Sequence, residues 1–242
     1  MADGIYVAMS GAVARESQLD SIADNLANAQ TPGFKASRPA FETFLPKGMP
    51  GEQTDKAFTA AVATATDMRP GQTVMTNNPM DATPDEGGFY AVMMPSGEVA
   101  YTRNGKLTVN TDGELMAANL PVLDYGNQPI LIPPGEQPTF LPNGTVKIHN
   151  EELTRIATYR LDGPVDRIGA TLLRPSVTPG QEGTVTELEG KLRVGELEMG
   201  NSSALEAAIQ MVSAQRQFET SMQAIDTYKK IGDRSNELGR IK

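Results

Sequence analysis

Two amphipathic segments, one at each end of the 242-residue chain, constrain its fold most. The first segment, residues 4–30, carries a stripe at alternating steps of four and three, made of Ile5, Met9, Ala12, Glu16, Leu19, Ala23 and Leu26, with Ile22 beside it. The C-terminal stripe is made of Ala204, Ala208, Met211, Gln215, Phe218, Met222 and Ile225, broadened by Leu205, Ile209 and Val212. Only Glu16 and Gln215 are polar. This spacing is the heptad repeat of coiled coils, so we predict two terminal helices that form a coiled-coil-like domain.

These helices have two possible roles. They could cover one globular core, as amphipathic helices often do, or they could associate with other chains. Their position at opposite chain ends and their narrow stripes favour association. A single pair of such helices is marginally stable in isolation, so we expect the ends to fold fully on assembly. Asn201 or Ser202 is the expected N-cap of the second helix, with Glu206 in its first turn.

The first helix runs into a turn that the sequence defines closely. Thr31 precedes a proline and is therefore excluded from the helical region. Pro32 followed by Gly33 suits a type II turn with Gly33 at positive φ. Phe34 is expected to dock and anchor the exit of the chain. Asn25 and Asn28 are expected to satisfy backbone groups at this helix end, which is also what ordinary capping residues do.

The middle of the chain is predicted to be β-rich and antiparallel. Three Asn-Gly or Asp-Gly motifs, at 101–107, 109–115 and 140–146, fit hairpins with a three-residue loop that ends in a left-handed glycine. That loop pairs Tyr101 with Leu107 (and Val99 with Val109), Val109 with Leu115, and Phe140 with Val146. Further strands are expected at 87–94, 120–132, 155–161, 168–174 and 184–197, with an extended connector at 46–72. The predicted fold class is α+β.

Charge and composition exclude several functions. Residues 1–48 carry four basic and five acidic side chains and residues 201–242 carry six and five, whereas residues 49–200 carry eleven and twenty. The acidic middle segments of different copies repel one another, whereas the nearly neutral ends are free to associate. The sequence contains no stripe of basic residues, so we expect no nucleic-acid binding. Because the chain has no cysteine and one histidine, His149, we expect no metal, no cofactor and no His-based catalysis.

The start of the chain does not resemble a signal peptide, since Asp3, Arg15, Glu16, Asp20 and Asp24 interrupt it. No stretch approaches the roughly 18 apolar residues of a membrane span. We therefore expect a protein that stays in the cytoplasm or leaves it without a cleaved signal, with no insertion into a membrane and no small-molecule substrate.

Two other classes of function stay open at this point. A glycosidase would need two carboxylates about 5–9.5 Å apart in a cleft, and the chain has many acidic residues, for example Asp85, Glu86, Glu187 and Glu189. Their number is better explained by a solvated acidic surface, and we expect no enzyme and no catalytic residues. A soluble binding module with a coiled coil as its dimeriser is the second alternative.

Several motifs resemble those of the bacterial flagellar rod and hook proteins, and they follow the family order. They are Ile22–Lys35, Asn77–Asp81, Gly87–Tyr90, Tyr101–Gly105, Gly195–Asn201 and Met211–Glu219. Within this family the opening, Asp3–Ala12, resembles the proximal-rod subunits more than the distal-rod or hook subunits, which remain alternatives.

The resemblance implies a structural subunit of the proximal rod that transmits torque from motor to hook. It would be exported by the flagellar type III apparatus and assemble in the periplasm, in the basal body, with copies of itself and neighbouring rod proteins. Residues 1–35 and 199–242 would form the inner tube, 36–75 the connector and 76–198 the outer domain. The expected subunit interface comprises Ile5, Met9, Leu19, Ile22, Asn25, Leu26, Asn28, Ala208, Met211, Gln215, Phe218, Met222 and Ile225, next to the turn of Pro32, Gly33 and Phe34.

Overall fold

The computed structural model describes residues 2–44, 58–149 and 151–239, and side chains from Ala8 to Arg234 outside 39–64, 150 and 181. The chain forms two compact units. The helical unit comprises Met1–Ala27, Ser37–Ala65 and Ser203–Lys242, and the β-rich unit comprises Asn28–Ala36 and Thr66–Ser202. The predicted α+β class, with a β-rich middle between terminal helices, is confirmed.

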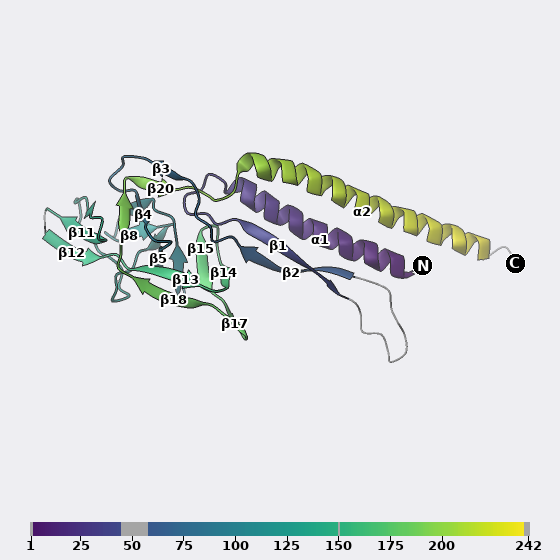
Figure 1. Cartoon of the computed structure of the whole chain (residues 1–242), viewed down its shortest axis with the longest axis horizontal. Coiled ribbons are helices and arrows are strands. Elements are labelled where there is room, and N and C mark those ends of the chain that lie inside the picture. Colours follow the sequence, from purple (N-terminus) through teal and green to yellow (C-terminus); the bar gives the residue numbers. More distant parts are fainter. Residues whose placement is uncertain (1, 45–57, 150, 240–242) are drawn as a thin grey trace. The chain divides into compact units, whose positions relative to one another are not determined.

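In the helical unit, α1 (Ala2–Ala27) lies between α2 (Ala204–Gly239) and β1 (Ser37–Phe44), and it contacts both (Figure 1). Ala12 and Ala14 are both buried. Because residues two positions apart in an α-helix point in nearly opposite directions, this agrees with packing on two sides of α1. Between the helices, Ile22, Ala207 and Ala214 are buried.

Residues 46–72, where the sequence indicated an extended connector, contain a paired strand. β1 pairs with β2 (Phe58–Thr66) in a two-stranded sheet of the helical unit. Residues 46–57 of this connector lie outside the described residues. The first helix ends at Ala27, earlier than the expected residue 30, so residues 28–36 belong to the β-rich unit.

The β-rich unit is built around a six-stranded antiparallel sheet in the order β14-β15-β6-β5-β13-β18. Its strands are β5 (Phe89–Met93), β6 (Val99–Thr102), β13 (Thr158–Asp162), β14 (Val165–Arg167), β15 (Leu172–Pro175) and β18 (Thr184–Leu188). A cluster of buried apolar side chains forms its main core, centred on Tyr90, Val92, Leu115, Val122, Ile130, Val146 and Ile156.

Smaller sheets complete this unit. One contains β7 (Leu107–Val109), β8 (Leu115–Ala117) and β9 (Leu120–Pro121), and another β10 (Thr139–Phe140), β11 (Thr145–Ile148) and β12 (Glu151–Arg155). Two-stranded pairs join β4 (Ala82–Pro84) with β19 (Leu192–Val194), β3 (Thr73–Met75) with β20 (Glu196–Glu198), and β16 (Val177–Thr178) with β17 (Gln181–Glu182).

Two of the three predicted hairpins are confirmed. Val109 pairs with Leu115 and Phe140 with Val146, and the glycines that close these loops, Gly113 and Gly144, have φ of 82° and 81°. The left-handed glycine closes the three-residue loop and sets this register.

The first predicted hairpin is wrong. Tyr101 pairs with Ala91 and Leu173, and Leu107 pairs with Ala117. Gly105 is not a turn glycine, because its carbonyl accepts a hydrogen bond from the Ala82 N–H and a Cβ there would lie 2.2 Å from the Ala82 oxygen. The chain crosses β4 at this point and enters a different sheet.

The other expected strands exist as shorter pieces. The strand at 87–94 is confirmed as β5. The single strand expected at 184–197 is three strands, β18, β19 and the start of β20, because Gly190 and Gly195 have φ of 77° and 78° and interrupt it. The segment expected at 168–174 contributes β15 only from Leu172 onward.

Candidate functional site

The chain reverses direction directly after α1, in the turn that the sequence predicted. The Phe34 N–H donates to the Thr31 carbonyl over 3.2 Å, and Gly33 has a φ of 74°. The Gly33 N–H is used as well, donating to the Glu198 carbonyl over 2.7 Å. The turn is thereby attached to β20 of the β-rich unit.

Phe34 anchors this turn, as predicted. Its side chain is fully buried, and the guanidinium of Arg167 lies 4.7 Å from its ring centroid. Arg167 also donates to the Lys35 carbonyl. One arginine therefore stacks on the aromatic ring and binds the backbone of the next residue.

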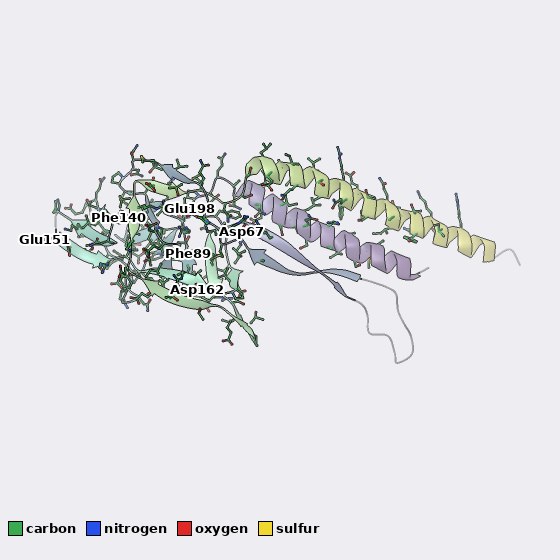
Figure 2. The ribbon with its side chains drawn as sticks, in the orientation of Figure 1. Asp67, Phe89, Phe140, Glu151, Asp162 and Glu198 are labelled. Atoms are coloured by element: carbon green, nitrogen blue, oxygen red, sulfur yellow. The ribbon has the colours of Figure 1, made fainter. Side chains whose placement is uncertain are left out.

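Beside Phe34 lies a buried cluster of three charges, here called the ion triad: Lys35, Arg103 and Glu198. Lys35 Nζ lies 2.8 Å from Glu198 Oε1, and Arg103 Nε lies 2.5 Å from Glu198 Oε2. The three side chains are only 3%, 4% and 1% exposed. Figure 2 shows Glu198 inside the β-rich unit. Buried charges of this kind are costly unless each is paired, and here each is.

The remaining hydrogen bonds of the ion triad go mainly to the backbone. Lys35 Nζ donates to the Arg69 carbonyl over 2.9 Å, and Glu198 Oε1 accepts from the Gly71 N–H over 3.0 Å. Arg103 donates to the Gly88 carbonyl. Five separate segments of the chain thus meet at this cluster.

Burial and pairing act in opposite directions on these groups. Burial alone raises the pKa of Glu198, but Arg103, Lys35 and the Gly71 N–H outweigh burial and hold this pKa below its usual value. Burial lowers the pKa of Lys35, because desolvation disfavours the ammonium, while the pairing with Glu198 opposes that shift.

The lowered pKa of Glu198 predicts a pH-dependent stability. Its contribution is complete above the glutamate pKa of the unfolded chain, about 4.3, and is lost as the pH falls through the lower folded pKa. We expect the gap in free energy of unfolding between wild type and Glu198→Gln to be constant from about pH 6 to 8 and to shrink below about pH 4, because protonated glutamate and glutamine are both neutral. Urea unfolding across this range measures the gap, and a gap that keeps its size at low pH would contradict the prediction.

Asn201 joins the same region. Its Oδ1 accepts from the Ala36 N–H over 2.6 Å, and its Nδ2 donates to the carbonyls of Asp67 and Arg69 over 2.7 and 2.9 Å. The prediction of Asn201 or Ser202 as the N-cap of α2 is wrong. Ser203 caps this helix, since its Oγ accepts from the Glu206 N–H and α2 begins at Ala204.

The structure brings together only part of the predicted helix stripes. Leu19, Leu26 and Met211 pack on the buried cluster of Ile22, Ala207 and Ala214. Ala208, Phe218 and Ile225 are half-buried, whereas Met9, Gln215 and Met222 are exposed. The side chain of Ile5 lies outside the described ones. The contact face of α2 therefore follows Ala207, Met211 and Ala214, shifted from the predicted stripe, because small alanines allow α1 to approach closely.

Asn25 and Asn28 are expected from the sequence to satisfy backbone groups. The Asn25 side chain hydrogen-bonds to the backbone, whereas the Asn28 side chain accepts from a hydroxyl group. Asn25 Nδ2 donates to the Ser37 carbonyl over 2.8 Å, and its Oδ1 accepts from the Ser37 N–H over 2.7 Å. Asn28 Oδ1 accepts from the Thr31 hydroxyl over 3.3 Å, and the Asn28 carbonyl accepts from the Thr31 N–H.

Large apolar side chains face outward on both helices. On α2, Leu205, Ile209 and Val212 are 74%, 64% and 51% exposed and follow steps of four and three. On α1, Met9 and Val13 are about half exposed. Residues at such steps lie on one side of a helix, so each helix has an apolar face that the described part of the chain leaves uncovered.

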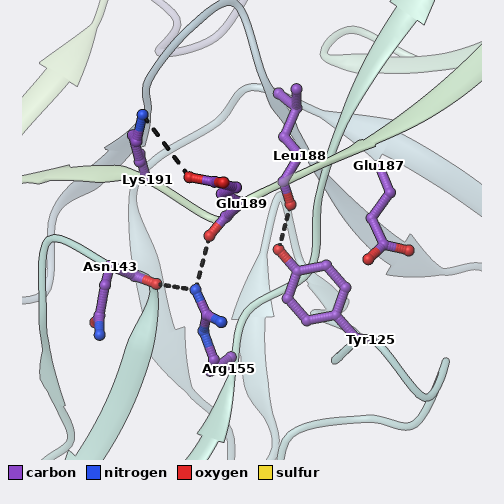
Figure 3. Close-up of a pocket in the computed structure, with 7 residues that line it drawn as sticks. All are labelled: Tyr125, Asn143, Arg155, Glu187, Leu188, Glu189 and Lys191. Atoms are coloured by element: carbon purple, nitrogen blue, oxygen red, sulfur yellow. Dashed lines mark hydrogen bonds and ion pairs between the residues drawn. The ribbon is translucent and has the colours of Figure 1, made fainter.

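Figure 3 shows a surface pocket of the β-rich unit, lined by Tyr125, Asn143, Arg155, Glu187, Leu188, Glu189 and Lys191. It contains two of the carboxylates considered for a glycosidase. Arg155 donates to the carbonyls of Asn143 and Glu189, and the Tyr125 hydroxyl donates to the Leu188 carbonyl. The polar groups of this pocket thus hold neighbouring loops together. In the described part of the chain, no three His, Asp or Glu side chains are placed to hold a metal ion.

Comparisons with known proteins match three regions of the chain. Residues 5–35 match the flagella basal body rod protein family, residues 85–148 the D1 domain of the flagellar hook protein FlgE/F/G family, and residues 193–238 the C-terminal region of the flagellar basal body rod FlgEFG proteins. Each region contributes one member of the ion triad. In the described ranges, no helix is long and apolar enough to cross a membrane.

Full-length relatives agree. The chain is 31% identical over 250 residues to the flagellar basal-body rod protein FlgF of Escherichia coli K12, covering 98% of both chains. It is also 31% identical over 268 residues to the rod protein FlgG of Borreliella burgdorferi, covering 99% of this chain and all of the other. The chain therefore belongs to the family of flagellar basal-body rod proteins, whose named members are structural proteins. The resemblance noted from the motifs is confirmed.

Proposed function

We propose that this chain is a structural subunit of the proximal part of the bacterial flagellar rod, polymerising through its terminal helices to transmit torque from motor to hook. Membership of the rod-protein family supports the assignment as a rod subunit, and several relatives are named FlgF. The observation that carries the polymerisation is the pair of apolar faces on α1 and α2 that stay exposed although the two helices already pack on each other.

A helical polymer needs contacts in which one patch of a subunit meets a different patch of the next. The two faces are suited to such a contact. On α2 the exposed stripe of Leu205, Ile209 and Val212 continues into Arg216, and on α1 Met9 and Val13 continue into Glu16 and Asp20. The apolar parts can pack with coiled-coil spacing, and the charged parts have opposite signs.

Export and location form part of the proposal. The subunit would leave the cytoplasm through the flagellar type III apparatus without cleavage of a signal peptide, and would assemble in the periplasm with copies of itself and neighbouring rod proteins. The acidic middle, with eleven basic and twenty acidic side chains, favours an outward, solvated position for the β-rich unit. A distal-rod or hook subunit of the same family is the alternative.

Replacement of two exposed side chains tests the helix contact. We expect wild type to form long polymers with rising concentration in sedimentation velocity. Leu205→Asp/Ile209→Asp should raise the concentration needed for polymerisation by at least about 100-fold, because each of the two buried side chains contributes about 1.5–3 kcal/mol. Helical content measured by circular dichroism should be unchanged, since both side chains are exposed.

The matched control is Leu153→Asp, which changes an exposed leucine on β12. It should polymerise like wild type. A discrete dimer at all concentrations would instead support a binding module with a helical dimeriser. Equal polymerisation of wild type and the double variant would show that these helix faces do not form the interface.

A further inference from the structure

We propose that the ion triad closes a junction that opens as one unit while the β-sheet core stays folded. The junction is defined as residues 28–36, 67–71 and 196–201, all within the β-rich unit. Its first segment leads out of α1 and its last leads into α2. The proposal concerns local opening of the monomer and does not depend on the flagellar assignment.

Charges from distant parts of the chain satisfy one another only when the junction is closed. Lys35 and Glu198 are 163 residues apart and Arg103 and Glu198 are 95 apart, yet all three meet in one buried site. Separation of residues 28–36 from residues 196–201 leaves Lys35 without its partner, and movement of Glu198 away from Arg103 leaves Arg103 without its partner. Water is then the only replacement, so the three charges must become hydrated together and the segments must move together.

Glu198 also accepts two backbone hydrogen bonds of the junction. Glu198 accepts the Gly33 N–H at its carbonyl and the Gly71 N–H at its carboxylate. The Asn201 N–H donates to the Phe34 carbonyl over 3.3 Å. These three N–H groups are here called the junction amides. Those of Gly33 and Asn201 are released when residues 196–201 move away from residues 33 and 34, and that of Gly71 is released when the Glu198 carboxylate leaves residue 71 in the same movement.

The junction is packed closely but mainly by backbone. A Cβ on Gly71 would lie 2.0 Å from the Met199 oxygen, and a Cβ on Gly200 would lie 2.7 Å from the Ala29 oxygen. The large apolar side chains that the junction buries are Phe34 and Leu197, and Met68 is partly buried. This apolar surface is smaller than that of the main core, and the charges regain their hydration on opening. Both effects make opening of the junction cheaper than unfolding of the sheet core.

Hydrogen exchange on the full chain tests this directly. The junction amides are compared with three amides of the sheet core, those of Leu115, Val122 and Ile130, which donate to backbone carbonyls at 2.8–3.0 Å. In wild type we expect the junction amides to exchange at one common rate, at least about tenfold faster than the core amides, with weaker dependence on urea. Junction amides that exchange in step with the core would overturn the proposal.

Two variants separate charge from packing. Glu198→Gln leaves two buried cations unpaired and should speed exchange of the junction amides about 100-fold or more, with under threefold change at the core. Lys35→Met/Arg103→Met/Glu198→Gln removes all three charges and keeps an acceptor for Gly71, so it should slow exchange at the junction below the wild-type rate. Faster exchange in this neutral variant, or equal effects of Glu198→Gln on both sets of amides, would contradict the proposal.

The control is Glu86→Gln, which breaks the 2.7 Å pair of Glu86 with Lys191 at an exposed site. It should leave both sets of amides unchanged. If Glu198→Gln fails to fold, the wild-type urea dependence and the neutral variant still decide the question, because neither requires that single substitution.

Discussion

Gly33→Ala should be among the most damaging single substitutions in the β-rich unit, costing more than about 4 kcal/mol of its free energy of unfolding. The φ of 74° at Gly33 already disfavours alanine by about 1–2 kcal/mol. The added Cβ would also lie 2.3 Å from the carbonyl carbon of Arg103 and from the nitrogen of Asn104. Backbone cannot rotate away as a side chain can, so the turn must separate from residues 103 and 104.

Gly97→Ala is the matched control for this prediction. Gly97 has a φ of 83° but no atom within 4 Å of its added Cβ. It should lose only the backbone contribution of about 1–2 kcal/mol. Urea unfolding of both variants measures the difference. Similar losses for the two would mean that the close approach at Gly33 relaxes at little cost.

Phe34→Ala is expected to cost about 3–5 kcal/mol, because it empties a fully buried aromatic site. The guanidinium of Arg167 would also lose the ring that lies 4.7 Å from it. The loss of free energy of unfolding should appear in urea unfolding. Hydrogen exchange should be accelerated most at the Gly33 and Asn201 amides, which are hydrogen-bonded beside Phe34.

Two further variants separate the contribution of buried volume to this loss from the contribution of the Arg167 contacts. Phe34→Leu keeps most of the buried volume and should cost less than half as much as alanine. Arg167→Met removes the cation over the ring and the donor to the Lys35 carbonyl while keeping an apolar stem. If Phe34→Ala cost less than about 1 kcal/mol, Phe34 would not be the anchor of the turn.

Local chemistry determined the elements that the sequence predicted well. Heptad periodicity marked both terminal helices, and the Thr31-Pro32-Gly33-Phe34 turn followed from the backbone limits of proline and glycine. The hairpins closed by Gly113 and Gly144 followed from the same preference of glycine for positive φ. In each case the residues that decide the structure are neighbours in the chain.

Elements decided by distant contacts were predicted less well. The Asn104-Gly105 motif has the composition of a hairpin turn, yet Gly105 is held against Ala82 and the chain crosses between sheets there. On α2 the contact face follows Ala207 and Ala214, because the close approach of α1 selects small side chains over a larger stripe. Periodicity indicates that a helix has an apolar face but not which of two apolar faces its partner covers.

The sequence alone determined the α+β class, the two terminal helices, the turn after α1 and, through its motifs, the flagellar rod family. Only the tertiary structure brought Lys35, Arg103 and Glu198 into one buried ion triad. Each of these residues lies in a motif that the sequence singled out, but nothing local to it requires a partner. The reason is physical: helix periodicity and turn geometry act over a few residues, whereas the pairing of buried charges depends on where the folded chain brings distant segments together.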